Sequence, residues 1–141
     1  MKNYTFELSS IINKLKEQGK MNFMPKATDD HIYRFEKINS VILPSQYKAW
    51  LLFSDGGDLF LPAGVQLYGV SHLPLIDVNN KYVPNNRYIV IGALASGDQI
   101  IFSKGEDQVS IFNHETEKIN YNESFADFFT FLTNLSEFLG L

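Results

Sequence analysis

The segment Leu43–Gly57, LPSQYKAWLLFSDGG, contains a short apolar helix pattern followed by two glycines. Proline suits the first turn of a helix, so the Leu-Pro pair is expected to open one. A glycine beyond a helix end adopts the left-handed backbone conformation that other residues resist, and a second glycine lets the chain reverse into a strand. We therefore expect the helix to end at Gly56-Gly57. Its apolar face carries Tyr47, Trp50, Leu51 and Ser54.

The two glycines stand between acidic residues, which leaves a phosphate or metal site as an alternative. A phosphate loop places its glycines before a helix, so that backbone N–H groups point at the anion, whereas these glycines follow one. A calcium loop alternates oxygen ligands over about twelve residues, but the sequence becomes apolar directly after Asp58. The pattern favours a structural role, although Asp55 and Asp58 could still face one cavity.

Two segments before this helix also have helical periodicity. The first has an apolar stripe and ends at Gly19, and its stripe consists of Leu8, Ile11, Ile12 and Leu15. The second begins at Thr28, a good N-cap, with Asp29 and Asp30 in the first turn, where carboxylates complement the helix dipole. Its expected apolar face consists of Ile32, Phe35 and Ile38.

After the glycines the pattern changes to strands and turns. Segments rich in β-branched and aromatic residues occupy 59–61, 65–70, 88–94, 99–104 and 108–113. The last three are separated by connectors too short for a crossover helix, so they should form an antiparallel meander. The asparagine-rich stretch 77–87 is expected to be a long surface connection.

A final helix is expected near the C-terminus. Ser124 with Asp127 has capping-box spacing, and Gly140 marks the end. The apolar stripe consists of Phe125, Phe128, Phe129, Leu132, Leu135 and Leu139. The order of elements predicts a single α+β domain over residues 1–141, with a central antiparallel sheet flanked by N-terminal helices and a C-terminal helix.

Composition restricts the class of protein. The chain has 141 residues, of which 45% are hydrophobic and 20% charged, which is typical of a globular domain. It has no cysteine, so disulfides, thiolate metal sites and a cysteine nucleophile are excluded. No apolar run has the length of a signal-peptide core or of a membrane span. We expect a cytoplasmic protein without a membrane partner.

Charge indicates the kind of partner. The net charge is −4, and residues 97–127 hold two lysines and seven acidic residues, which gives this region a net charge of −5. Nucleic-acid binding depends largely on Lys and Arg that neutralise phosphates, so no nucleic-acid partner is expected. A basic protein partner fits better. The alternative is that these acids are ordinary solvated residues.

Catalytic patterns are weak. The histidines His31, His72 and His114 form no spaced ligand pair, and no metal or cofactor is expected. Ser96 precedes a strand and not the helix that a nucleophile elbow requires. Carboxylate pairs for glycoside cleavage, Asp55 with Asp58 or Asp98 with Glu115, are possible without being favoured. We expect no enzyme.

The segment 43–57 resembles the hallmark of the Smi-one/Knr-four family of the SUKH superfamily, in which Leu-Pro opens a helix with a Tyr and an aromatic-Leu pair and the segment ends in Gly-Gly. Further matches come in the family's order: LYG (67–69), YIVIG (88–92), GDQIIFS (97–103), FNHET (112–116) and SFADFFTFL (124–132). The resemblance covers residues 28–135. Two departures are Phe102-Ser103, where the family often has an acid, and the stretch 77–87.

This resemblance implies an α+β fold with a central antiparallel sheet, in agreement with the pattern above. In bacteria many members resemble immunity proteins, encoded beside polymorphic toxins, that bind and block a nuclease or other enzymatic domain. Fungal relatives regulate cell-wall synthesis. Neither role requires catalysis.

Two functional hypotheses follow. The first is an immunity protein that binds a cognate, basic toxin domain through acids in or beside the turns of the meander, namely Asp98, Glu106, Asp107, Glu115 and Glu117. The alternative is a regulatory or small-ligand-binding scaffold with a cleft near Tyr47, Asp55 and Tyr68. The sequence leaves the oligomeric state open.

Overall fold

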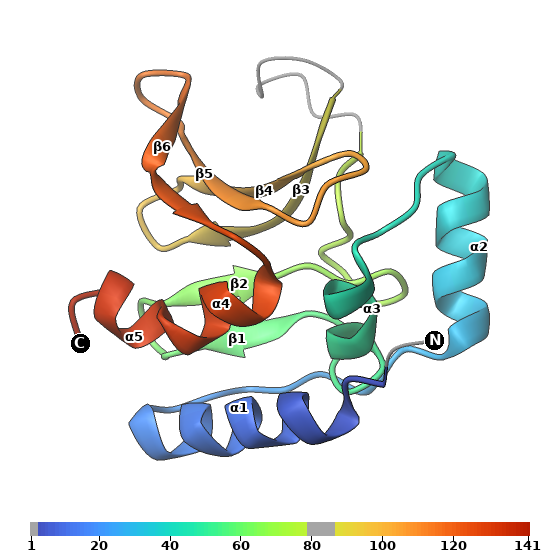
Figure 1. Cartoon of the computed structure of the whole chain (residues 1–141), viewed down its shortest axis with the longest axis horizontal. Helices are drawn as coiled ribbons and strands as arrows, with labels where there is room; N and C mark the ends of the chain where they lie inside the picture. Colours follow the sequence, from blue (N-terminus) through green and yellow to red (C-terminus); the bar gives the residue numbers. More distant parts are fainter. Residues whose placement is uncertain (1–2, 79–86) are drawn as a thin grey trace.

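The computed structural model describes residues 3–78 and 87–141 and has the expected α+β fold (Figure 1). Its helices are α1 (Thr5–Gln18), α2 (Asp29–Asn39), α3 (Ser45–Leu51), α4 (Phe128–Thr133) and α5 (Leu135–Phe138). Its strands are β1 (Gly57–Leu59), β2 (Val65–Leu67), β3 (Tyr88–Leu94), β4 (Gln99–Ser103), β5 (Val109–Asn113) and β6 (Lys118–Phe125). Most of the expected surface connection 77–87 lies outside the described residues.

The strands form one sheet in the order β1-β2-β3-β4-β5-β6, and every neighbouring pair is antiparallel. The predicted meander is therefore confirmed, and it extends over all six strands. Successive turns of a meander lie at opposite ends of the sheet, so every second turn shares an end. Turns 60–64, 95–98 and 114–117 share one end, here named the three-turn end, and turn 104–108 lies at the other, here named the opposite end.

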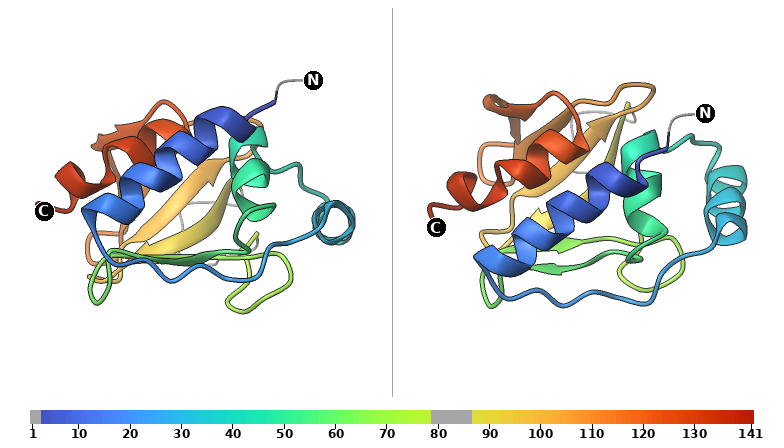
Figure 2. Two further views of the ribbon diagram at one scale, coloured as in Figure 1. Left: turned by 90° about the horizontal axis from the view of Figure 1, so that it is seen from below. Right: turned by 60° about the horizontal axis from the view of Figure 1, so that its bottom comes forward.

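Helices α1 and α4 lie side by side across one face of the sheet, and α3 packs beside them, whereas α2 lies at the edge of the molecule (Figures 1 and 2). The core lies between these helices and the sheet. Its largest fully buried side chains include Trp50, Tyr47, Phe102 and Phe128. The second face carries a smaller apolar cluster centred on Val90, Ile101 and Phe112.

The first two helices agree with the prediction in their bounds. The stripe of α1 buries Leu8, Ile12 and Leu15, and Thr28 caps α2. Its hydroxyl accepts from the His31 N–H, while the His31 ring accepts from the Thr28 N–H. The prediction for Ile38 is wrong: its side chain is 81% exposed, because α2 covers the core with its first turns only.

The third helix is shorter than predicted. It ends at Leu51, and the glycines lie beyond an intervening turn instead of at the helix end. Their predicted conformation is nevertheless correct, because Gly56 has φ +93° and Gly57 has φ +120°, and β1 begins at Gly57. The glycines thus shape the entry to the strand and do not stop the helix.

The C-terminal part differs from the prediction in two ways. Strand β6 was not predicted, because its sequence KINYNESF contains two asparagines, which are rare in strands. Ser124 lies in β6, and Asp127 caps α4 instead by accepting from the Thr130 N–H. The single predicted helix is divided at Asn134, whose side chain donates to the Thr130 carbonyl and competes with regular helix bonding.

Within residues 3–78 and 87–141, no helix combines the length and the apolar character needed to cross a bilayer.

Candidate functional site

The FSDGG turn is a hub of structural hydrogen bonds. Both the Trp50 indole N–H (3.0 Å) and the Ser54 hydroxyl (2.7 Å) donate to the Gly56 carbonyl. A Cβ on Gly56 would lie 2.6 Å from the Leu67 carbonyl oxygen, so only glycine fits here. The indole of Trp50 and the hydroxyl of Ser54 therefore tie the turn to the end of α3, and the missing side chain of Gly56 lets the turn approach β2.

Asp55 also has a structural role, because its carboxylate is bonded within the fold. Its side chain is fully buried, and it accepts hydrogen bonds from the backbone N–H groups of Val70, Ser71 and His72 at 2.7–3.0 Å. The His72 ring nitrogen Nδ1 lies 2.8 Å from the same carboxylate. Gly69 permits this approach, because a Cβ there would lie 2.6 Å from Asp55 Oδ1. Asp55 thus anchors the loop after β2.

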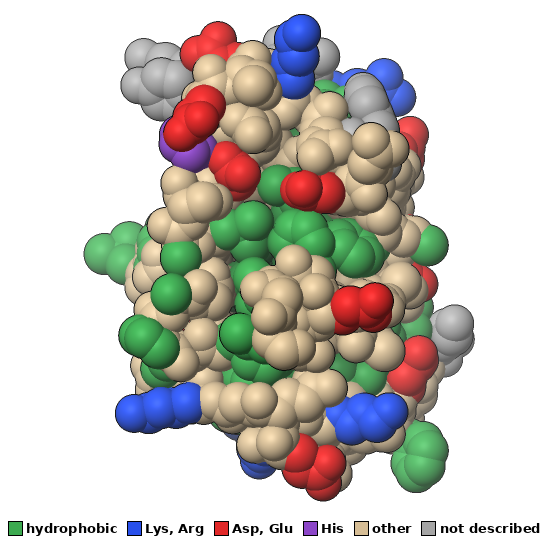
Figure 3. Space-filling view, turned by 90° about the vertical axis from the view of Figure 1, so that its left-hand side faces the viewer, with side chains coloured by type: hydrophobic (Ala, Val, Ile, Leu, Met, Phe, Trp, Pro, Cys, Tyr) green, Lys and Arg blue, Asp and Glu red, His purple; other side chains and the backbone are tan. Residues whose placement is uncertain are grey.

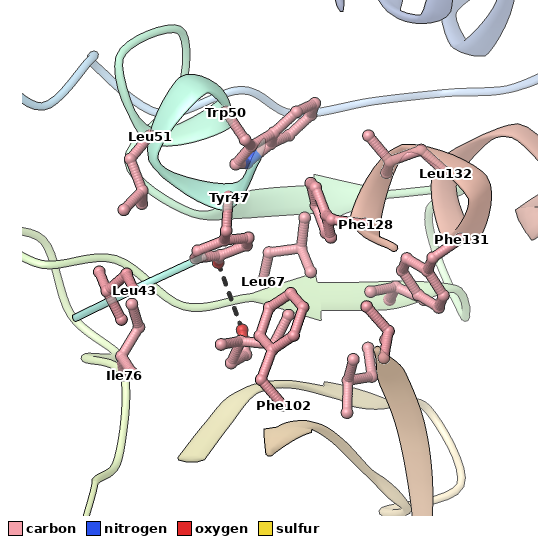
Figure 4. Close-up of a cluster of buried hydrophobic side chains, with 14 of the residues drawn as sticks. Leu43, Tyr47, Trp50, Leu51, Leu67, Ile76, Phe102, Phe128, Phe131 and Leu132 are labelled. Atoms are coloured by element: carbon pink, nitrogen blue, oxygen red, sulfur yellow. Dashed lines mark hydrogen bonds between the residues drawn. The ribbon is translucent and has the colours of Figure 1, made fainter. Parts of the chain in front are cut away.

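Tyr47 is also part of the interior (Figure 4). Its side chain is fully buried among core residues, and its hydroxyl donates to the Tyr68 carbonyl at 2.5 Å. Burial, and to a smaller extent the charge of Asp55, raises the pKa of the Tyr47 hydroxyl well above its ordinary value. Tyr47 therefore stays a neutral hydrogen-bond donor.

Two of the three residues of the alternative cleft are interior residues. Tyr47 and Asp55 are buried with their polar atoms bonded mainly to backbone groups, and neither they nor Tyr68 lines the cavities of about 170 Å³ and 610 Å³. Tyr68 is half-buried and packs against the second-face cluster, and burial together with Asp77 raises the pKa of its hydroxyl. Sequence alone could not show that the backbone supplies the hydrogen-bond partners of Tyr47 and Asp55.

The predicted acidic residues separate into two groups. Asp98, Glu115 and Glu117 lie in turns 95–98 and 114–117, which share the three-turn end. Asp98 is largely buried and bound to His114, because its Oδ1 lies 2.6 Å from Nδ1 of that ring and accepts from the His114 N–H. Glu115 and Glu117 are exposed. The Asp98–His114 contact was missed in sequence, although the register of the hairpins brings these turns together.

The other two acids lie at the opposite end of the sheet. Glu106 and Asp107 are in turn 104–108, and Glu106 is within 3.6 Å of the Arg87 guanidinium. They border a cavity of about 610 Å³ whose remaining wall comes from the α2–α3 connection, Lys48 and Lys104. Basic and acidic side chains are therefore balanced here, and the five predicted residues do not form one surface.

The three-turn end has the layout of an interaction surface. Figure 3 looks at this end of the molecule and shows hydrophobic side chains across its middle, with several acidic side chains, a histidine and basic side chains above them and both basic and acidic side chains below. A second cavity, of about 170 Å³, opens here between turns 60–64 and 95–98, and Asp58 lies in its wall. An apolar centre with a charged rim is typical of protein–protein interfaces.

Of the candidate catalytic and metal-binding patterns, the structure brings together Asp98 and Glu115, which lie 2.6 Å and 3.9 Å from the two nitrogens of the His114 ring, and it separates the others. His31 takes part in the cap of α2, His72 bonds Asp55, and His114 bonds Asp98, so the three histidines occupy separate places. Among the described residues, no group of three or more His, Asp or Glu side chains is placed to hold a metal ion. Asp55 and Asp58 share no cavity, because Asp55 points to the loop after β2.

Comparison with curated proteins gives no match to this chain. A family model does match it, over residues 26–132, and its description is SMI1 / KNR4 family (SUKH-1). The match includes the α3 segment, the glycine turn, the meander and most of α4. Because it covers well over half of the chain, the protein belongs to the SMI1 / KNR4 family (SUKH-1).

Proposed function

We propose that this chain is a non-catalytic binding protein that neutralises a toxin domain by docking its three-turn end on a basic surface of that domain. The family supports this proposal, because the resemblance of many bacterial members to immunity proteins implies such a role. The fungal type of regulatory role is less favoured, since the side chains of Tyr47 and Asp55 are buried and their polar atoms are bonded mainly to backbone groups.

The observation that carries the proposal is the grouping of two exposed acids, Glu115 and Glu117, with the His114-bound Asp98 at the end of the molecule whose middle carries hydrophobic side chains (Figure 3). Asp98, Glu115 and Glu117 come from two turns that the meander places side by side, and Lys118 is the basic residue next to them. Acidic rims speed the encounter with a basic partner, and the apolar centre supplies contact area after docking. The surface thus combines the two properties that rapid and tight capture requires.

The polar residues of the hallmark motif support a binding role in a different way. Tyr47, Asp55 and the Gly56 turn hold the fold together, and their polar atoms are bonded to backbone groups. They shape the framework on which the turns are displayed. We therefore place the function on the turns and not on the motif.

The proposal is tested with the protein domain encoded by the reading frame immediately upstream of this one. We expect the two purified proteins to form a stable complex in size-exclusion chromatography, and the chain to abolish the enzymatic activity of the domain at an equimolar ratio. A domain that stays active and unbound in the presence of excess chain would contradict the proposal.

A further inference from the structure

A row of polar side chains crosses the second face of the sheet near the three-turn end. Strand register pairs Asp58 with Gln66, Gln66 with Ala93, and Ala93 with Gln99. Side chains paired in this way lie on one face, with their Cβ atoms about 4.5–5.5 Å apart. The row therefore presents one carboxylate and two amides around a single small side chain, Ala93.

The small side chain leaves room in the row. Ala93 lines the cavity of about 170 Å³, whose apolar wall includes Leu61, Pro62 and Ala95. Small-molecule pockets usually measure about 300–1,000 Å³, so this cavity suits one long side chain better than a whole ligand. An occupant must therefore be part of a larger molecule.

The polar groups of the cavity are suited to a positively charged occupant. Asp58 is the charged residue in its wall, and the Asp58 carboxylate accepts one long hydrogen bond, of 3.4 Å, from the Asn22 amide. An ionised carboxylate has room for about four donors. Most of its capacity to accept hydrogen bonds is therefore left for an incoming group.

Gln66 adds a second polar group to the wall. It lies next to Asp58 in the row, its side chain is exposed, and it lines the cavity. Its amide can both donate and accept a hydrogen bond. Gln99, at the far end of the row, does not line the cavity, although among the described residues its Oε1 is the buried side-chain oxygen for which the structure shows no donor.

We propose that this cavity receives an arginine or lysine side chain of a protein partner. The aliphatic stem of such a side chain packs against Leu61 and Pro62, as long basic side chains do on apolar surface. Its charged head donates to Asp58, and a further donor serves the amide oxygen of Gln66. This inference rests on the proposed function and specifies the chemistry of the partner at one point of the three-turn end.

The test uses the full chain labelled with ¹⁵N and the peptide Ac-Gly-Arg-Gly-NH₂ as a probe. In an NMR titration we expect saturable shifts of the backbone amides of Gln66, Ala95 and Gln99, with millimolar affinity. The same peptide with norleucine in place of arginine keeps the stem and removes the charge, and it should leave these amides nearly unshifted. Absence of saturable shifts, or equal shifts with norleucine, would overturn the proposal.

Two substitutions distinguish the cavity from general attraction to an acidic protein. Asp58→Asn removes the charge in the cavity wall and should weaken binding of the arginine peptide about tenfold. Asp107→Asn removes one charge from the exposed turn at the opposite end and should leave the affinity unchanged. Equal weakening in both variants would show non-specific attraction and reject the cavity as the site.

Gln66→Met tests the amide separately. Methionine keeps the size of the side chain and removes the amide, so the melting temperature should stay nearly equal, because Gln66 is exposed, while binding of the arginine peptide weakens several-fold. A lower melting temperature with unchanged binding would show that Gln66 serves the fold alone.

The peptide test does not depend on a toxin. If the toxin domain is captured but the arginine peptide gives no shifts, the cavity proposal alone fails. If the peptide binds as expected but the toxin domain is not captured, the proposed function fails and the chemistry of the cavity stands.

Discussion

Asp55 shows how a single buried residue holds together segments that are distant in sequence. Three backbone N–H groups and one histidine ring surround its carboxylate, and the donors come from a loop 15 to 17 residues further along the chain. An acceptor with fewer lone pairs cannot serve all of them. Loop anchoring thus explains the acid that stands directly before the two glycines of this chain.

Asp55→Asn should lower the free energy of unfolding by about 2–4 kcal/mol, because the amide nitrogen faces N–H donors that then lack an acceptor. Urea denaturation monitored by tryptophan fluorescence measures this change. Asp107→Asn, in an exposed turn, is the matched control and should stay within about 0.5 kcal/mol of the natural protein. A change of less than about 1 kcal/mol at Asp55 would contradict the anchoring role.

Tyr47 leads to a prediction about pH. Burial raises the pKa of its hydroxyl above the ordinary value of 10.0, so the folded protein keeps a proton that the unfolded chain loses at high pH. Stability is therefore unaffected by this group below about pH 10 and falls above it, by up to about 1.4 kcal/mol per pH unit.

Tyr47→Phe should cost about 1–2 kcal/mol at pH 7, because the Tyr68 carbonyl loses its donor. Above pH 10 the gap between the natural protein and the variant should close, since phenylalanine does not ionise. Denaturation at pH 7, 10 and 11 measures the gap, and Tyr33→Phe, at an exposed ring, is the control at pH 7. A gap that stays constant up to pH 11 would contradict the assignment.

At the scale of elements, the turn between α3 and β1 decides how the helical layer joins the sheet. Gly56 combines a positive φ with close approach to the β2 backbone. Gly105 also has a positive φ, of 82°, but among the described residues no atom lies within 4 Å of the position that a Cβ would take there. A substitution at Gly56 therefore tests backbone strain and close packing together, whereas a substitution at Gly105 tests backbone strain alone.

Gly56→Ala should destabilise the protein by about 3 kcal/mol or more, because the methyl group meets the Leu67 carbonyl in addition to the left-handed strain. Gly105→Ala should cost about 1 kcal/mol, from strain alone. Thermal and urea unfolding of the two variants measure the difference. Costs that agree within about 0.5 kcal/mol would show that close approach plays no part at Gly56.

Elements with strong local signals were predictable. The stripe of α1, the cap of α2 and the whole of β3 follow from periodicity and capping chemistry that need no tertiary information. Strand β6 was not predictable, because its pairing with β5 overrides the low strand propensity of asparagine. The break at Asn134 was not predictable either, because it depends on a hydrogen bond from the Asn134 side chain to the helix backbone.

At the scale of the whole molecule, the meander decides which charges act together. The acidic region 97–127 is continuous in sequence, yet its successive turns lie at opposite ends of the sheet. Counting the turns of the predicted meander could have separated Glu106 and Asp107 from the other acids. The cavity at Asp58 could not have been predicted, because it depends on the register of β1 and β2, whose pairing the sequence pattern did not specify.

Because the acids are distributed over two ends of the sheet, each end serves as a control for the other. At the three-turn end Glu115 and Glu117 are exposed beside apolar surface, and at the opposite end Glu106 is paired with Arg87. Electrostatic steering depends on exposed, uncompensated charge near the contact surface. Reversal of two charges should therefore matter at one end only.

The most direct test is the association rate with the upstream-encoded toxin domain, measured by stopped-flow fluorescence as a function of salt. We predict that Glu115→Lys with Glu117→Lys slows association about tenfold at low salt and that the difference disappears near about 0.5 M, where the charges are screened. Glu106→Lys with Asp107→Lys should leave the rate nearly unchanged. An unchanged rate for the first variant, or equal slowing by both, would contradict docking through the three-turn end.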